Sequence, residues 1–253
     1  MSLCLSIVKI VTKQPSYPKK KMVGTYDPAS VVGAVKEVAI PRMRAPDEQD
    51  KVGRQRARAI QTQLVLQELP PLPGWEAAFS YKPAGVVGGD YVDLFPVDVD
   101  KYGFVVGDVS GKGFPGAMVM VMVRSAFRMA TFGILSPREA VCKVSRLIRQ
   151  DMTQGMFVSI VYGILDLTTG TVRIANSGHN PPFVHEASTG QTRRLPPGGL
   201  PIGIVAPERF EASLVDIEVP MQPGSHLMVY TDGVVEAMNE EQQEFGEERT
   251  LST

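Results

Sequence analysis

The sequence predicts an α+β fold in which mainly antiparallel sheets are flanked by helices. Two consecutive helical segments, at about residues 115–131 and 136–148, stand between two groups of strand-like segments. Strands and helices therefore do not alternate as they do in the βαβ units of a parallel sheet. Residues 166–170 add a hairpin signature, because they end on glycine between two apolar runs.

Each predicted element has its own local signal. The second helix begins at Ser136-Pro137-Arg138-Glu139, where serine can cap the helix, proline suits the first helical position and glutamate can reach back to the cap. Apolar runs bounded by turn residues indicate strands. These are Trp75–Tyr81, Tyr91–Val97, Tyr102–Val109, Phe157–Leu165, Thr171–Asn176, Phe210–Val219 and His226–Tyr230.

The chain divides into three regions. Residues 1–46 form a proline-containing N-terminal segment of unknown role, which we interpret as a remnant of an upstream module that includes a short apolar strand at its start. The pattern of residues 47–73 predicts an amphipathic linker helix, which ends before a group of prolines. This helix either packs on the following domain or pairs with a second copy in a homodimer. Residues 74–253 form the main domain.

Composition excludes several classes of protein. The 253 residues are 43% hydrophobic and 21% charged, with 26 basic and 27 acidic side chains. This near-neutral balance gives no electrostatic reason to expect a nucleic acid or a membrane surface as partner. Cys4 and Cys142 are too far apart in sequence to suggest a disulfide framework or a thiolate zinc site, and a reducing cytoplasm fits this cysteine usage.

Three glycine-bounded motifs place an aspartate beside strand-like sequence. They are Gly88-Gly89-Asp90-Tyr91-Val92-Asp93, Gly107-Asp108-Val109-Ser110-Gly111-Lys112-Gly113 and Tyr230-Thr231-Asp232-Gly233. Hard cations such as Mg²⁺ and Mn²⁺ prefer oxygen ligands, and carboxylates at neighbouring strand ends can supply them. An ordinary turn explains any one motif alone, but three in one domain favour a metal site.

Other catalytic classes are less well supported. No Gly-x-Ser-x-Gly elbow and no His-Glu-x-x-His helix occurs in the sequence, and residues 107–113 lack the spacing of a phosphate-binding P-loop. His179 lies in a turn-rich stretch, where it either organises the loop or lines a site. A metal-dependent nuclease is disfavoured because the chain has no basic face.

At these motifs the sequence resembles the SpoIIE-like branch of the PPM-type metal-dependent serine/threonine protein phosphatases. The matching blocks lie in the family's order between about residues 74 and 246. They are Pro83 with Val87–Asp93, Gly107–Gly113, Met156–Ser159, Asn176–Pro182, Leu200–Gly203 and Tyr230–Ala237. Several independent blocks in order are far more specific than any one of them.

The resemblance implies a β-sandwich with helices on both outer faces and a site for two Mn²⁺ or Mg²⁺ ions at one edge. By analogy, Asp108 would bridge the ions, the carbonyl of Val109 and Asp232 would be ligands, and Asp90 would lie in or next to the ligand set. The implied reaction is hydrolysis of phosphoserine or phosphothreonine on a protein, often a small anti-anti-sigma regulator in a bacterial partner-switching pathway. Ions that lower the pKa of water and neutralise phosphoryl charge suit this chemistry.

One feature departs from the family pattern. The family ends with a further strand and an Asp-Asp-x-Thr-type motif that supplies another metal ligand, whereas this sequence ends at Thr253, 21 residues after Asp232, without it. We therefore expect a C-terminally incomplete domain that holds one ion less tightly than the other. The alternative function is a catalytically weak or inactive regulatory module that binds a phosphoprotein partner.

Overall fold

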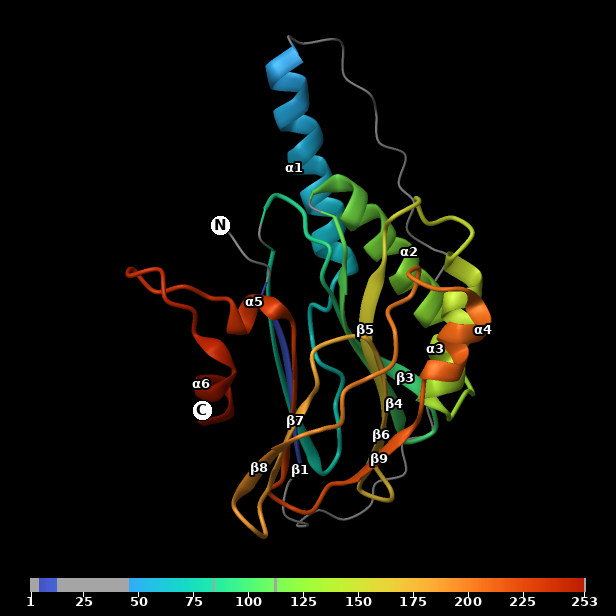
Figure 1. Ribbon diagram of the computed structural model, residues 1–253, viewed down its shortest axis with the longest axis vertical. Coiled ribbons are helices and arrows are strands. Elements are labelled where there is room, and N and C mark those ends of the chain that lie inside the picture. Colours follow the sequence, from blue (N-terminus) through green and yellow to red (C-terminus); the bar gives the residue numbers. More distant parts are fainter. Residues whose placement is uncertain (1–4, 13–45, 84, 112, 253) are drawn as a thin grey trace.

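The computed structural model describes residues 5–12, 46–83, 85–111 and 113–252, which form two antiparallel sheets packed face to face with helices outside them (Figure 1). This arrangement confirms the predicted α+β class. The strands are β1 (Leu5–Thr12), β2 (Trp75–Lys82), β3 (Tyr91–Asp98), β4 (Lys101–Val109), β5 (Val158–Asp166), β6 (Thr171–Ser177), β7 (Phe183–Glu186), β8 (Gln191–Arg194), β9 (Ile217–Pro220) and β10 (His226–Tyr230). The helices are α1 (Pro46–Leu64), α2 (Phe114–Ala130), α3 (Pro137–Ile148), α4 (Pro207–Ser213), α5 (Asp232–Val235) and α6 (Gly246–Ser252).

Each sheet has five strands, and every pairing between them is antiparallel. The first sheet has the order β2-β1-β10-β7-β8, and the second has the order β3-β4-β5-β6-β9. The second sheet is largely a meander, because β3, β4, β5 and β6 pair in chain order. In the first sheet β1 pairs with β2 and with β10, so it joins distant parts of the chain.

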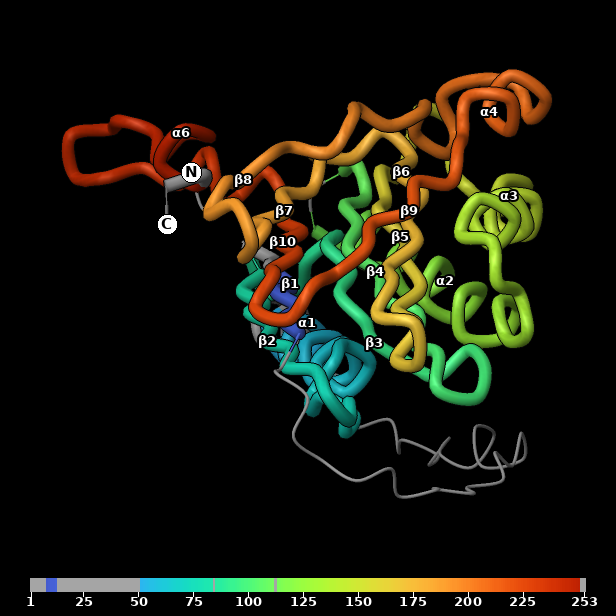
Figure 2. Tube along the Cα trace, turned by 90° about the horizontal axis from the view of Figure 1, so that it is seen from below, coloured from blue at the N-terminus to red at the C-terminus, as the bar shows by residue number. Residues whose placement is uncertain are grey.

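Figure 2 shows helices α2 and α3 beside the second sheet, and two apolar layers hold the elements together. One fills the space between the sheets, where side chains such as Ile10, Phe104 and Leu227 are fully buried. The other lies between the second sheet and helices α2 and α3, and includes Phe127 and Cys142. Burial of apolar area on both faces of the second sheet contributes about 25 cal/mol per Å² and makes this sheet the centre of the molecule.

Several local predictions are confirmed. The Ser136 hydroxyl accepts a hydrogen bond from the Glu139 amide at 3.1 Å, so serine caps α3 as its sequence indicates. The β5–β6 hairpin turns at Gly170, whose φ of 71° is the left-handed conformation that favours glycine. A carboxylate oxygen of Asp166 accepts hydrogen bonds from the turn amides of residues 168 and 169.

Two predictions need correction. The strand predicted at 210–219 is shorter, because Pro207–Ser213 forms the helix α4 and only Ile217–Pro220 is a strand. Pro207 suits the first turn of a helix, and the spacing of Phe210 and Leu214 buries both side chains on one helical face. In addition, the strand β8 was missed because its four residues are all exposed and carry no apolar alternation.

The N-terminal segment contributes to the domain. Strand β1 comes from the region that we set apart as residues 1–46, yet it pairs along its whole length with β2 and also with β10. The domain boundary predicted at residue 74 therefore leaves out one strand of the first sheet. The rest of the segment, residues 13–45, lies outside the described residues. Among the described helices, none combines the length and the hydropathy that a membrane span requires.

The linker helix is present as α1, and its C-terminal end packs on the domain. Gln61 is buried. Just beyond the helix, Val65 belongs to the apolar layer under α2 and α3, and Leu66 belongs to the layer between the sheets. The N-terminal part of α1 extends away from the sheets (Figure 1). Packing on the domain is thus confirmed for the C-terminal end of the helix, whereas pairing with a second copy stays a prediction.

Candidate metal centre

The first two acidic motifs meet through the β3–β4 hairpin. Asp90 directly precedes β3, and Asp108 is the last residue but one of β4. Tyr91 is paired with Gly107 in this antiparallel ladder, so the register brings residue 90 beside residue 108. The negative charge of Asp90 therefore acts directly on the carboxyl group of Asp108.

The third aspartate arrives from the other sheet. Asp232 is the first residue of α5, one residue after β10 ends. Burial, together with the negative charges of Asp90 and Asp232 and the hydrogen bond with Asp90, raises the pKa of Asp108 to about 7. The structure therefore gathers these three carboxyl groups at one edge of the sandwich.

Glycines let the motif loops approach one another closely. A Cβ atom on Gly89 would lie 2.7 Å from the carbonyl oxygen of Val109, so the predicted carbonyl ligand packs directly on the first motif. A Cβ atom on Gly116, in the first turn of α2, would lie 2.3 Å from the carbonyl oxygen of Gly111. Gly116 belongs to none of the predicted motifs. Its position could have been a signal, because a glycine inside a helix costs about 1 kcal/mol relative to alanine.

The donor set fits a hard divalent cation. All the candidate ligands are oxygens. Burial, together with the negative charges of Asp90 and Asp232, raises the pKa of Asp108, and a bound cation would stabilise its charged form. Among the described residues, no group of three or more Asp, Glu, His or Cys side chains is arranged so that these side chains alone could hold a metal ion. The β3–β4 register nevertheless places Asp90 beside Asp108.

Asp93, the second aspartate of the first motif, is engaged elsewhere. Its fully buried carboxylate accepts two hydrogen bonds from the Arg128 guanidinium, at 2.7 and 2.6 Å, and one from the Tyr91 hydroxyl at 2.7 Å. The Leu94 amide donates a further bond at 2.9 Å. Asp93 thus joins β3 to α2 and is not available as a metal ligand, whereas Asp90, three residues earlier, faces the acidic cluster.

His179 is buried between strands of both sheets, with a side chain only 6% exposed. Its Nδ1 lies 2.8 Å from the Ser159 hydroxyl, and its Nε2 lies 3.1 Å from the carbonyl oxygen of Tyr230. Burial lowers the pKa of His179 to about 4, although the Tyr230 carbonyl opposes this shift. The ring of His179 thus contacts residues outside its own loop, and a role in lining the site stays a prediction.

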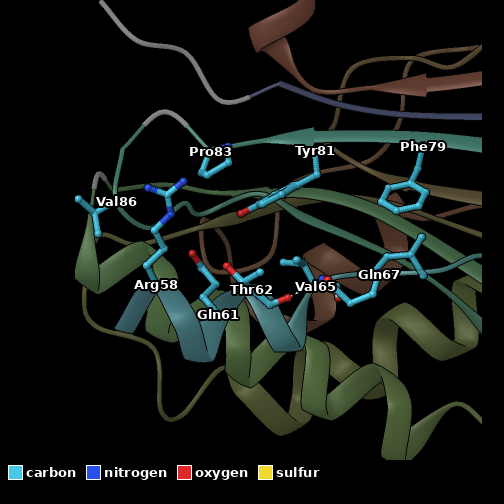
Figure 3. Close-up of a pocket in the computed structure, with 10 residues that line it drawn as sticks. Arg58, Gln61, Thr62, Val65, Gln67, Phe79, Tyr81, Pro83 and Val86 are labelled. Carbon is cyan, nitrogen blue, oxygen red and sulfur yellow. Dashed lines mark hydrogen bonds between the residues drawn. The ribbon is translucent and has the colours of Figure 1, made fainter. Parts of the chain in front are cut away.

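Gln61 connects the linker helix to the first motif. Its amide donates to the Gly88 carbonyl at 2.7 Å and accepts from the Gly88 amide at 2.9 Å. Beside this contact, a cavity of about 320 Å³ separates α1 from β2 (Figure 3). Its walls include Arg58, Thr62, Val65, Phe79, Tyr81 and Pro83. The cavity adjoins the motif loop but contains none of the three clustered aspartates.

Comparison with known proteins identifies a family. Residues 98–253, more than half of the chain, match the family described as Stage II sporulation protein E (SpoIIE). The matched region contains the second and third acidic motifs and both central helices. The first motif, with Asp90, lies just before it.

Curated relatives match over a longer part of the chain. Protein IcfG of Synechocystis sp. is 29% identical over an alignment of 245 residues, and this alignment covers 85% of this chain and 38% of that protein. Phosphoserine phosphatase RsbU of Bacillus subtilis is 23% identical over 184 residues, which are 73% of this chain and 53% of that protein. The chain therefore spans between about a third and about half of the length of these relatives.

A solved structure shares the fold. The SiaA-PP2C domain of Pseudomonas aeruginosa superposes with a TM-score of 0.63 over 83% of each chain, at 20% sequence identity. This likeness agrees with the two antiparallel sheets and flanking helices described above. The family match and the ordered motifs lead to one conclusion. The chain belongs to the SpoIIE family and, with it, to the SpoIIE-like branch of the PPM-type protein phosphatases.

Proposed function

We propose that this protein hydrolyses phosphoserine or phosphothreonine on a protein partner, with Mn²⁺ or Mg²⁺ held by Asp90, Asp108, the Val109 carbonyl and Asp232. The observation that carries this proposal is the gathering of three carboxyl groups, from both sheets, around Asp108 at one edge of the sandwich. RsbU, a relative with matching sequence, is named a phosphoserine phosphatase.

The residues of the chain have separate parts in this proposal. Asp90, Asp108 and Asp232 bring negative charge to one point, and the close glycine contacts keep the loops that carry them in place. Bound divalent ions would lower the pKa of water and neutralise charge on the transferring phosphoryl group. Rigid strand ends suit this task because charge stabilisation is strongest when the ligands do not have to rearrange.

For the substrate, we propose a small phosphorylated regulator of the anti-anti-sigma type in a partner-switching pathway. The support is family membership together with the relatives RsbU and RsbP, both named phosphoserine phosphatases. The near-neutral charge of the chain gives no competing reason to choose a nucleic acid substrate.

The test is phosphate release from such a phosphoprotein, measured as Mn²⁺ or Mg²⁺ is titrated. We expect Asp108→Asn to reduce the rate at least about 100-fold, since metal activation supplies several kcal/mol of the barrier reduction. The control is Asp100→Asn, at the other end of the β3–β4 hairpin, where the exposed residue has a φ of 56° that asparagine also accepts. Equal rates for the two variants, or release that persists in a chelator, would contradict the proposal.

A different result would favour the regulatory alternative. If wild-type protein binds the phosphorylated partner tightly but releases no phosphate at any metal concentration, the chain is a binding module and not an enzyme. Calorimetric titration with the phosphorylated and unphosphorylated partner separates the two functions.

A further inference from the structure

The backbone of His179 is held by hydrogen bonds within its own loop, separately from the contacts of its ring. Its backbone amide donates to the Asn176 side-chain oxygen at 2.8 Å, and its carbonyl accepts from the Asn176 side-chain nitrogen at 3.0 Å. Gly178, with a φ of 67°, packs against the ring of Pro201. The loop is thus organised through Asn176 and glycine, and the two ring nitrogens of His179 remain to bind groups outside it.

The contacts define the state of the ring. The Tyr230 carbonyl can only accept a hydrogen bond, so the Nε2 of His179 carries the proton and donates it. In the neutral ring Nδ1 is then an acceptor, and the Ser159 hydroxyl donates to it. Because burial keeps the pKa of His179 far below neutrality, the ring stays neutral at physiological pH and both hydrogen bonds persist.

Each partner of the ring adjoins one of the clustered aspartates. Ser159 in β5 lies directly opposite Asp108 in β4. Directly opposed residues of an antiparallel pair have side chains on the same face, with Cβ atoms about 4.5–5.5 Å apart. Tyr230 is the last residue of β10, two positions before Asp232. The ring therefore links the strand that flanks Asp108, in the second sheet, to the strand that delivers Asp232, in the first.

We infer that His179 is a positioning residue that sets the spacing between Asp108 and Asp232 by joining the two sheets at the edge where these aspartates lie. The inference rests on the proposed metal site. The space between the two sheets is filled by an apolar layer, and such non-directional packing tolerates small shifts of one sheet against the other. Two hydrogen bonds to a rigid ring restrict such shifts, and metal ligands need this precision because coordination distances are fixed within a few tenths of an ångström.

The test compares three variants with a control of similar stability. His179→Leu removes both ring contacts, His179→Gln keeps a donor that can reach the Tyr230 carbonyl, and Ser159→Ala removes one contact with little change in volume. Val172→Ala, in the apolar layer between the sheets, serves as the control for general destabilisation. Calorimetric Mn²⁺ titration measures affinity, and amide hydrogen exchange of residues 228–234 in metal-free protein measures the freedom of the β10 end.

We expect His179→Leu to weaken Mn²⁺ binding by about 10-fold, within the range found when groups that orient metal ligands are removed. His179→Gln should recover part of this loss, Ser159→Ala should show a smaller loss, and Val172→Ala should bind Mn²⁺ as the wild type does. Exchange of residues 228–234 should be faster in His179→Leu than in the control.

Other outcomes overturn the inference. If His179→Leu and Val172→Ala have equal Mn²⁺ affinity, or if exchange speeds up at residues 228–234 without any change in affinity, His179 has only a structural role. If wild-type protein binds no metal, the proposed function fails. The exchange experiment then still decides whether His179 holds the end of β10, because it needs no metal.

Discussion

The buried ion pair between Arg128 and Asp93 allows a sharp test of how α2 is attached to the sheet. The side chain of Asp93 is fully buried, and its carboxylate accepts two hydrogen bonds from the guanidinium of Arg128. In Arg128→Met the apolar stem can still cover Phe95, over which the guanidinium lies at 5.5 Å. The carboxylate, however, keeps only the Tyr91 hydroxyl and the Leu94 amide as donors.

Removal of one partner from a buried pair leaves an uncompensated charge, which costs about 3–5 kcal/mol. We therefore expect Arg128→Met to lower the free energy of unfolding by about this amount. A matched control is Arg193→Met, which breaks an ion pair with Glu186 whose side chains are 48% and 39% exposed. Such exposed pairs contribute about 0–1 kcal/mol, so the control should unfold almost as the wild type does.

Urea unfolding, followed by the fluorescence of the single tryptophan, Trp75, measures both free energies. The double variant Arg128→Met with Asp93→Asn should be more stable than Arg128→Met alone, because it no longer buries a charge without a partner. Equal losses for Arg128→Met and Arg193→Met would refute the reasoning. A double variant that is no more stable than Arg128→Met would refute it as well.

Three further predictions follow from contacts near the acidic cluster. Gly116→Ala places a Cβ atom where the Gly111 carbonyl lies, so thermal unfolding should show a loss of about 1–3 kcal/mol and calorimetry should show weaker Mn²⁺ binding. Gln61→Ala leaves the buried Gly88 amide and carbonyl without their side-chain partner, and urea unfolding should show a loss of about 1–3 kcal/mol. His179 has a folded pKa of about 4 against 6.5 in the unfolded chain, so the unfolded state binds the proton first as pH falls. The contribution of neutral His179 to the free energy of unfolding is complete above pH 6.5 and is lost as the pH falls towards about 4. Wild-type protein should therefore lose about 3 kcal/mol more stability than His179→Gln across that interval, in urea unfolding at a series of pH values.

Each of these predictions has a control in the same chain. Gly53→Ala, in α1 where a Cβ atom meets nothing within 4 Å, should be neutral or stabilising. Gln63→Ala, exposed on the same helix as Gln61, should leave stability unchanged. Val172→Ala, which removes no titratable group, should keep the wild-type dependence of stability on pH. A Gly116→Ala protein as stable as Gly53→Ala, a silent Gln61→Ala, or the same pH dependence in His179→Gln and wild type would contradict the respective argument.

The sequence by itself determined what depends on local patterns. Signals within a few neighbouring residues predicted the two central helices, the cap at Ser136, the β5–β6 hairpin and the antiparallel α+β class. The structure confirms these predictions. The motif order was equally informative, since it indicated the family before any contact was known. The strand predicted over residues 210–219 was partly wrong, because Phe210 and Leu214 are apolar in a spacing that a short helix buries as well as a strand does.

Only the tertiary structure decided which acidic residues lie together. Asp90 and Asp93 are both aspartates of one short motif, yet the first lies beside Asp108 and the second is bound by Arg128 from a helix that follows later in the chain. Likewise, strand pairing and sheet packing place His179 between Ser159 and Tyr230, which the sequence separates by 71 positions. The physical reason is that sequence patterns report the burial and conformation of each segment, whereas the register and packing of distant segments decide which side chains meet.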